Sequence, residues 1–464
     1  MTSFNRVLKC ISNVNHCVID DVELRQLSDG SECLHIYVRL KKGHKHHCPI
    51  CGKKCSGYDR VTSSNLFASE LEQQYPSYWR APDLGTIKVI LHGQLDRINC
   101  PEHGVLVEGV PWAYPNCHCT TAFDKIAAYL GIHLNRSMAS KILRVDYKSI
   151  GRSISRVRED IEPDITVRFN NLVNIGVDET SYKKGHSYVT VVVNHDTSEV
   201  VWVHEGHSEE TFSLFFEALT PEQRASIKTV SGDGAKWIDA CIKKYCPEAK
   251  RNIDCFHVVE WALEALDEVR KEEWREKHKL RQKLEKEMQA KKDKTEAKDK
   301  KLAKELAEAK QAATDIKNTR YAVGKNPDNL TKNQEIKLEV IAQASPRLHR
   351  AYNLKEMLRT ALHFEKPEEA EVALKEFYFR ATHSKLAPFK ELGHKIKRHM
   401  EGILNTIGSK ISNARCEGFN SKIKLLIRKA RGFRNLDNMI DLIYLSCGNL
   451  RLTLPGWGNY YLEL

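Results

Sequence analysis

The pattern of apolar and polar positions changes several times along the chain. Residues 1 to about 113 contain short strand-like runs, such as Leu34 to Leu40 and Thr86 to Leu91, among Cys, His, Gly and Pro. This composition predicts a small β-rich domain. From about Thr120 to Asp160, apolar residues recur every three or four positions, which predicts short basic helices.

After Pro163 the pattern predicts strands. LVNIGVD, SYVTVVVN and EVVWVHEG come first, and a helix, the strand IKTVSGD, another helix and the strand RNIDCF follow. This order predicts a mixed α/β sheet in which the first three strands form a meander and the last two run parallel to the first. The order is that of an RNase H-like sheet.

From about Val258 onward the chain is predicted to be helical for some 150 residues. The Lys/Glu-rich run from Arg270 to Lys310 favours a solvated helix or coiled coil with i,i+4 charge pairs over a binding tail. The block NARCEGFNSKIKLLIRKARGFRNLDNMIDLIYLSCG closes the chain with further helix.

Composition narrows the class of protein. The 464 residues include 73 Lys and Arg against 61 Asp and Glu, a net charge of +12, and 41% are hydrophobic. We expect neither a membrane span nor a secretion signal, because long apolar runs are missing and the first residues are polar. A basic chain favours a polyanionic partner such as nucleic acid. Without an export signal, the 14 cysteines favour metal binding over disulfides.

Two knuckles of metal-ligand spacing lie in the first segment. Cys48-x-x-Cys51 and Cys100-x-x-His103 together offer three thiolates and one imidazole, a closed set suited to structural Zn²⁺. The alternatives are reduced buried cysteines and, for the second knuckle, a simple turn. Nearby residues keep the fourth ligand open: Cys55, His46, His47, Cys117 and Cys119.

The segment RSMASKILRVDYKSIGRSISRVRED has the proportions of a helix-turn-helix, with helices over Ser137 to Leu143 and Tyr147 to Arg158. In this interpretation several polar and basic side chains can reach DNA: Lys148, Arg152, Ser155, Arg156 and Arg158. An ordinary helical hairpin with a solvated basic face is the alternative.

Acidic residues follow two of the predicted strands. Asp178 ends VNIGVD and Asp233 ends IKTVSGD, and these strand ends lie side by side in an RNase H-like sheet. Carboxylates brought together there need a hard cation such as Mg²⁺. Glu417 starts a late helix and is the candidate third acid. Singly, each acid also fits a turn or helix-cap role, and Glu179 is an alternative ligand.

The knuckles, the helix-turn-helix, IGVDE, SGDGA, DCFHVV and the NARCEGFN block occur in an order that resembles the bacterial DDE transposases of the ISL-three insertion-sequence group. The resemblance implies that Asp178, Asp233 and Glu417 are the catalytic acids and bind Mg²⁺ or Mn²⁺. Asp254 and His257 match an Asp-x-x-His signature with an implied supporting role; they also fit a strand end and a helix cap.

The resemblance also implies a multidomain α+β architecture. The separation of 184 positions from Asp233 to Glu417 implies an all-helical insertion into an RNase H-like catalytic domain. The expected organisation is a zinc-binding domain (1–113), a helix-turn-helix domain (114–165), the first catalytic part (166–262), the insertion (263–411) and the last catalytic part (412–464).

The implied function is transposition, in which terminal inverted repeats are bound and cut and the 3′-OH is joined to target DNA by two-metal chemistry. Basic residues after Glu417 can line a DNA channel: Lys422, Lys424, Arg428, Lys429, Arg431 and Arg434. These cations also fit a solvated amphipathic helix. We expect a homodimer or higher homo-oligomer, without a membrane partner, in the bacterial cytoplasm and on the nucleoid when bound to DNA.

Three other functions compete with this one. The main alternative is a catalytically inactive or domesticated DNA-binding regulator derived from a transposase, which should have lost at least one metal carboxylate. A metal-dependent nuclease or resolvase would cut without joining. A zinc-stabilised scaffold would show no divalent-dependent activity.

Overall fold

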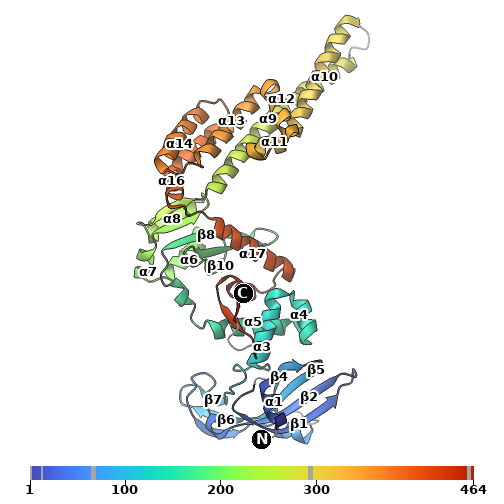
Figure 1. Cartoon of the computed structure of the whole chain (residues 1–464), viewed down its shortest axis with the longest axis vertical. Helices are drawn as coiled ribbons and strands as arrows, with labels where there is room; N and C mark the ends of the chain where they lie inside the picture. Colours follow the sequence, from blue (N-terminus) through green and yellow to red (C-terminus); the bar gives the residue numbers. More distant parts are fainter. Residues whose placement is uncertain (1–2, 12–13, 64–68, 291–295, 457–460, 464) are drawn as a thin grey trace.

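The computed structural model describes residues 3–11, 14–63, 69–290, 296–456 and 461–463. The molecule is elongated, and its segments follow one another along the long axis (Figure 1). The N-terminal strands lie at one end, and a helical segment with a projecting hairpin lies at the other. The C-terminal residues return to the middle, beside α5. The protein is a mixed α/β molecule with several sheets and many helices.

The N-terminal segment is rich in strands, as the composition predicted, and these strands form two sheets. The larger sheet has the order β1-β2-β5-β4, and the smaller has the order β3-β6-β7. Trp79 and Trp112 meet edge to face in the core of the larger sheet, with ring centroids 5.6 Å apart. The elements of the segment are α1 (Ser3–Ile11), β1 (Cys17–Gln26), β2 (Glu32–Leu40), β3 (Ser56–Arg60), α2 (Glu70–Gln74), β4 (Ser77–Leu84), β5 (Ile87–Gln94), β6 (Asp96–Cys100) and β7 (Gly104–Val107).

Three helices follow: α3 (Thr121–His133), α4 (Arg136–Leu143) and α5 (Tyr147–Ile161). The Asn135 and Asp146 side chains accept hydrogen bonds from free backbone N–H groups and so begin α4 and α5. Arg144 ends α4 with a left-handed conformation, φ 54°. The two predicted helices are confirmed within about three residues, the uncertainty usual at helix ends.

The central sheet has the order β10-β9-β8-β11-β12. The predicted meander and the predicted parallel direction of the last two strands are both confirmed. α6 and α8 cover one face through an apolar core that includes three buried phenylalanines, and α17 and α18 cover the other. The elements are β8 (Asn174–Lys183), β9 (Ser187–Asn194), β10 (Glu199–Glu205), α6 (Glu209–Glu217), α7 (Pro221–Ser226), β11 (Thr229–Gly232), α8 (Lys236–Tyr245) and β12 (Lys250–Ile253).

One expectation about the first strand is wrong. The sequence pattern ended this strand at Asp178, but β8 continues to Lys183. The reason is that β8 has two different neighbours. It pairs with β11 as far as Gly176, but its pairing with β9 continues, with Thr180 opposite Val189. Asp178 therefore lies within β8, near the level at which β11 ends.

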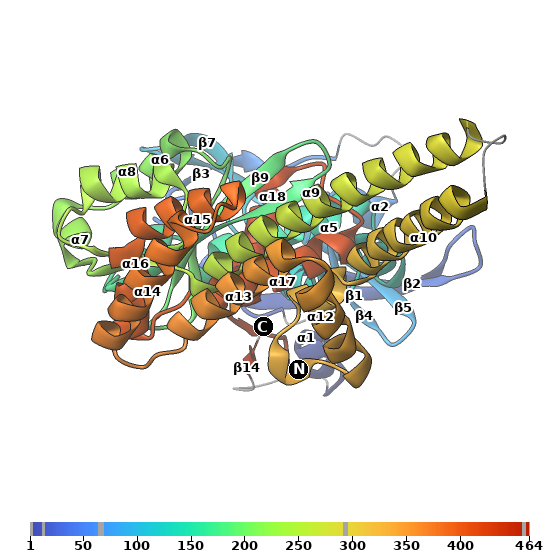
Figure 2. The same cartoon turned by 90° about the horizontal axis from the view of Figure 1, so that it is seen from above.

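The insertion between β12 and α17 is helical, as predicted. α9 and α10 form a long hairpin that projects from the molecule in both views (Figures 1 and 2). Leu284, Leu302 and Leu306 pack between them, and Lys310 pairs with Glu285 at 3.3 Å. The helices of the insertion are α9 (Cys255–Ala290), α10 (Glu296–Asn318), α11 (Arg320–Gly324), α12 (Lys332–Ala344), α13 (Pro346–Ala361), α14 (Pro367–Thr382), α15 (Ala387–Arg398) and α16 (Met400–Ser409).

The chain then returns to the central sheet through α17 (Ala414–Ala430) and α18 (Leu436–Cys447) and ends with β13 (Arg451–Thr453) and β14 (Tyr461–Glu463). The closing block is thus two helices, separated where Arg431 and Gly432 adopt positive φ angles of 57° and 92°. Among the described residues, no helix is long and apolar enough to span a membrane.

Candidate active site and nucleic-acid interface

Three acidic residues lie on neighbouring parallel strands at one edge of the central sheet: one lies within its strand, and two directly follow theirs. Ser231 of β11 is opposite Gly176 of β8, and Gly232 of β11 is opposite Ile253 of β12. Asp178 and Asp233 each lie two residues beyond the first pair, and Asp254 follows Ile253. The sheet register therefore brings these three acids to the same edge.

α17 adds a fourth acid to this group. Glu417 lies in the first turn of α17, which packs on β8, and its carboxylate, that of Asp254 and the His257 ring lie within 4.8 Å of one another. Asn420, one turn further along α17, donates a hydrogen bond of 2.8 Å to Asp178. The structure thus gathers the acids from one strand, from the two positions that directly follow β11 and β12, and from one helix.

Burial and nearby carboxylates raise the pKa of three acids at this edge, Asp178, Glu179 and Glu417. Burial raises the pKa of Asp178, and the carboxylates of Asp233 and Asp254 raise it further. Burial also raises the pKa of Glu417, with Asp254 as the main charged neighbour. Burial, Asp233 and Asp178 together raise the pKa of Glu179 to about 7. The site therefore concentrates negative charge that a cation would relieve.

His257 lies beside this cluster and bridges two acids. Its Nδ1 is 3.1 Å from Glu260, and its Nε2 is 4.0 Å from Asp254. Burial lowers the pKa of His257, but the hydrogen bond with Glu260 and the nearby aspartates outweigh it and raise the pKa overall. Asp254 Oδ2 is buried without a hydrogen-bond partner in the described part of the chain, so this donor set has an unused oxygen that fits a hard cation.

Sequence reasoning missed the polar side chains that support this edge. His195 and Ser231 are 2.7 Å apart, and Ser231 donates to Asn413, just before α17, at 2.9 Å. Burial lowers the pKa of His195 to about 4, so the ring is neutral at pH 7. Ser231 and Asn413 lie within the SGD and NARCEGFN motifs, whereas His195 lies in neither and had no comparable signal.

The two Cys/His knuckles meet at the smaller N-terminal sheet. The ligand atoms of Cys48, Cys51, Cys100 and His103 lie within 4.8 Å of one another. Cys51 and Cys100 sulfurs are 3.8 Å apart, and His103 Nδ1 is 3.7 Å from Cys48 and 3.6 Å from Cys100. Ligands about 2.3 Å from a tetrahedral Zn²⁺ are separated by about this distance.

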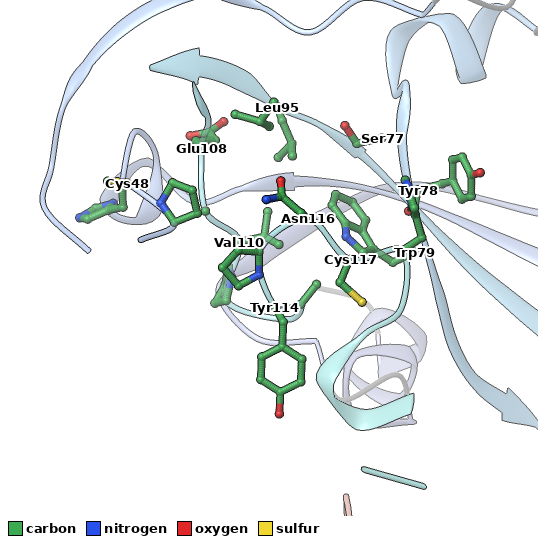
Figure 3. Close-up of a pocket in the computed structure, with 18 of the residues that line it drawn as sticks. Cys48, Ser77, Tyr78, Trp79, Leu95, Glu108, Val110, Tyr114, Asn116 and Cys117 are labelled. Atoms are coloured by element: carbon green, nitrogen blue, oxygen red, sulfur yellow. Dashed lines mark hydrogen bonds between the residues drawn. The ribbon is translucent and has the colours of Figure 1, made fainter. Parts of the chain in front are cut away.

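Most of the alternative ligands lie in other environments, but Cys55 packs against Cys48 and Cys100 at the border of the knuckle cluster. His46 Nε2 is 3.2 Å from Asp96, and Cys55 donates to the Lys53 carbonyl. Cys117 and Cys119 form a different buried group with Asp124. His47 lines a cavity of about 640 Å³ between the knuckle and the larger sheet (Figure 3). Pro and aromatic side chains line much of this cavity, and none of the acids of the central sheet reaches it.

The predicted DNA-contact residues of α5 separate into two kinds. Lys148 and Arg152 are exposed. Arg156 instead makes a bidentate pair with buried Asp124 at 2.7 and 2.8 Å, and Arg158 pairs with Asp441 of α18 at 3.0 Å. Ser155 also donates to Asp441. These three side chains therefore join α5 to its neighbours.

The basic residues of the closing segment are all exposed, but they differ in what they face. Lys422 donates to the Ser446 carbonyl of α18, and both Lys422 and Lys429 lie near His133 of α3, whose pKa burial and these two cations lower. Arg428 donates to the Lys424 carbonyl of its own helix at 3.4 Å. Arg431 and Arg434 line a groove beside α5.

Comparison with known proteins identifies the family. The family model of ISL3-type DDE proteins, described as a transposase, matches residues 175–443. A transposase for insertion sequence element IS1557 from two strains of Mycobacterium tuberculosis is 38% identical over 445 residues, 96% of this chain and 95% of that protein. A transposase for insertion sequence element IS1001 from Bordetella parapertussis is 26% identical over 392 residues, 84% of this chain and 85% of that protein. The chain belongs to the ISL3 family of DDE transposases.

Proposed function

We propose that this protein binds the terminal inverted repeats of an insertion sequence, cuts the DNA at its ends and joins the freed 3′-OH to target DNA. The observation that carries the proposal is the gathering of acids at one edge of an RNase H-like sheet, where β8, β11 and α17 supply Asp178, Asp233 and Glu417. Family membership supports the same reaction class.

In this proposal Asp178, Asp233 and Glu417 hold Mg²⁺ or Mn²⁺, which would stabilise charge at the scissile phosphate and activate the attacking hydroxyl. Asn420 orients Asp178 through its hydrogen bond. Asp254 and His257 act as supporting residues: Asp254 borders Glu417, and His257, whose pKa the hydrogen bond with Glu260 and the nearby aspartates raise, balances part of the negative charge when its ring is protonated. Glu179 contacts Trp237 on the α8 side, so we assign it no ligand role.

Recognition of the terminal inverted repeats is assigned to the zinc-binding domain and the helix-turn-helix domain. Cys48, Cys51, Cys100 and His103 hold a structural Zn²⁺ that fixes the small sheet. DNA contacts are proposed for those exposed basic residues of α5 and the closing segment that, among the described residues, neither form an ion pair nor face α3 or α18: Lys148, Arg152, Lys424, Arg428, Arg431 and Arg434. We also predict assembly as a homodimer or higher oligomer, because two DNA ends must be held together before joining.

The test uses the full chain with labelled DNA that carries the element ends, in Mg²⁺, in Mn²⁺ and in EDTA. We expect metal-dependent cuts at the ends and strand-transfer products on a target plasmid. Asp233→Asn should abolish both. Glu248→Gln is the matched control, because this exposed acid precedes β12 at the opposite edge of the same sheet.

Specific DNA binding without cleavage under every condition would contradict the catalytic assignment. It would favour the second candidate, a catalytically inactive DNA-binding regulator. Cuts without strand transfer would instead favour a nuclease.

A further inference from the structure

A basic groove lies where three segments distant in sequence meet. It has a volume of about 910 Å³, and the start of α5, the end of β8 and the turn after α17 line it. Four cations border it: Lys148, Lys183, Arg431 and Arg434. Asp146 is the one acid in its lining, and this carboxylate is occupied as the N-cap of α5, where it accepts hydrogen bonds from Lys148 N, Ser149 N and Ser149 Oγ.

The four cations are available to a ligand. Lys148, Arg431 and Arg434 are exposed, and within the described residues no ion pair engages any of the four. Four like charges around one groove repel one another unless a polyanion neutralises them. The groove is therefore suited to a phosphate backbone.

The surrounding contacts fix the position of the groove relative to the acids. Arg136 of α4 lies over the rings of Tyr147 and Phe433, 5.8 and 5.1 Å from their centroids, and donates to Asn438. Tyr147 and Phe433 are themselves part of the groove wall. The helix-turn-helix and the α17–α18 turn are thus held together before any ligand binds.

α17 connects the groove to the acid cluster along one face. Lys424, Arg428 and Arg431 follow Glu417 by 7, 11 and 14 positions, which places them within about 40° of Glu417 around the helix axis. Lys422 and Lys429 lie about 120–140° away, on the flank that faces α3 and α18. Only one flank of α17 therefore forms a continuous basic path from the acids to the groove.

From these observations we infer that the groove holds the phosphate backbone of the DNA end that α5 contacts, and that the Lys424–Arg428–Arg431 stripe directs this DNA to the acid cluster. The four groove residues are positioning residues, and Lys183 was not among the DNA contacts expected from the sequence. Glu417 and Arg431 are about 21 Å apart along the helix, which corresponds to about six base pairs of duplex. The inference rests on the proposed function, because it assumes that the chain holds duplex DNA.

The test measures binding of the full chain to a random-sequence duplex in metal-free buffer as a function of salt. The slope of log K against log salt is negative, and each lost phosphate contact reduces its magnitude by about 0.9. The Lys183→Ala/Arg434→Ala double variant should therefore have a slope shallower by about 2. The charge-conserving Lys183→Arg/Arg434→Lys variant should restore the slope. Lys429→Ala, next to Arg428 but on the other flank of α17, should leave it unchanged.

An unchanged slope in a folded double variant would overturn the inference, as would an equal loss in Lys429→Ala or no rescue by the charge-conserving variant. Because this assay needs neither metal nor cleavage, DNA binding in the groove can be established even if the wild-type chain cuts no DNA. Cleavage by the wild type together with an unaltered slope in the double variant would reject the role of the groove but not the proposed function. On a duplex that the wild type cuts, hydroxyl-radical footprinting should show protection about six base pairs from the cut, lost in the double variant.

Discussion

Gly176 offers a sharp test of how the acid cluster is held, because it lies in β8 directly under α17. A Cβ added there would be 2.5 Å from the Cys416 sulfur and 2.6 Å from His195 Nε2. Both neighbours are buried, and His195 is held by Ser231. Neither side chain has a flexible end that can turn away.

The size of the effect follows from these distances. Moving the Cys416 sulfur from 2.5 Å to the 3.4 Å of an ordinary van der Waals contact requires a shift of about 0.9 Å. Cys416 immediately precedes Glu417, so α17 carries the acid with it. Overpacking of this kind costs about 1–3 kcal/mol, and a misplacement of about 1 Å at a reacting group lowers the rate about 10²-fold.

We therefore expect Gly176→Ala to melt at a lower temperature and to cleave labelled element ends about 10²-fold more slowly, with the salt dependence of DNA binding unchanged. Gly418→Ala is the stability control: no heavy atom lies within 4 Å of its added Cβ, and alanine inside a helix stabilises by about 0.5–1 kcal/mol. Wild-type melting and cleavage in Gly176→Ala would refute the argument that this contact positions Glu417.

Three further predictions follow from the acids, the knuckles and the α5–α18 contact. In EDTA, the pKa of Glu179 is raised to about 7 from the 4.5 of the free acid, so its contribution to stability is fully present below pH 4.5 and is lost as pH rises through 7. The rise in melting temperature on adding Mg²⁺ should therefore be larger at pH 8 than at pH 5.5. An equal rise at both pH values would contradict this prediction. The purified chain should hold one Zn²⁺ by atomic absorption, and Cys100→Ser should lose it and expose the N-terminal segment to protease; full zinc in the variant would exclude Cys100 as a ligand. Asp441→Ala removes the 3.0 Å ion pair of Arg158 and the acceptor of the Ser155 hydroxyl, and it leaves Arg158 with longer contacts to Glu159 and the Glu162 carbonyl. It should cost about 1.5–3 kcal/mol, measured by denaturant unfolding, whereas an unchanged midpoint would show that this contact does not stabilise the α5–α18 interface.

The elements of the central sheet could be predicted because local pattern decides them. Strands such as SYVTVVVN are nearly continuous β-branched runs, and the helices between the later strands have clear apolar spacing. Strand direction also followed, because a strand reached through a helix returns parallel to its neighbour. The extension of β8 to Lys183 could not be predicted this way, since it depends on pairing with β9 after β11 has ended.

The acids were predictable as a group, but their supports were not. Asp178, Asp233 and Glu417 stood out together, because the predicted strand order brings two strand ends side by side, although each acid alone also fits a turn or helix-cap role. Asn420, His195 and Asn413 carry no comparable signal. Their roles depend on the rotation of α17 over the sheet, which only tertiary packing sets.

The charge of a side chain also proved a poor guide to what it faces. Arg152 and Arg156 lie in the same helix, one turn apart, and both fitted a DNA-contact role in the sequence. In the structure Arg152 is exposed while Arg156 is paired with Asp124, whose side chain is fully buried. The acidic partner lies in α3, 32 positions earlier, so no local pattern could have assigned the pair.

The same argument explains why α17 matters beyond Glu417. One rigid helix holds an acid of the candidate active site in its first turn and ends at the groove beside α5. β8 makes the same connection, since it contains Asp178 and ends at Lys183. Any shift of the helix-turn-helix against the sheet would change the alignment of both elements, so a variant that displaces the groove is expected to misplace the scissile phosphate as well.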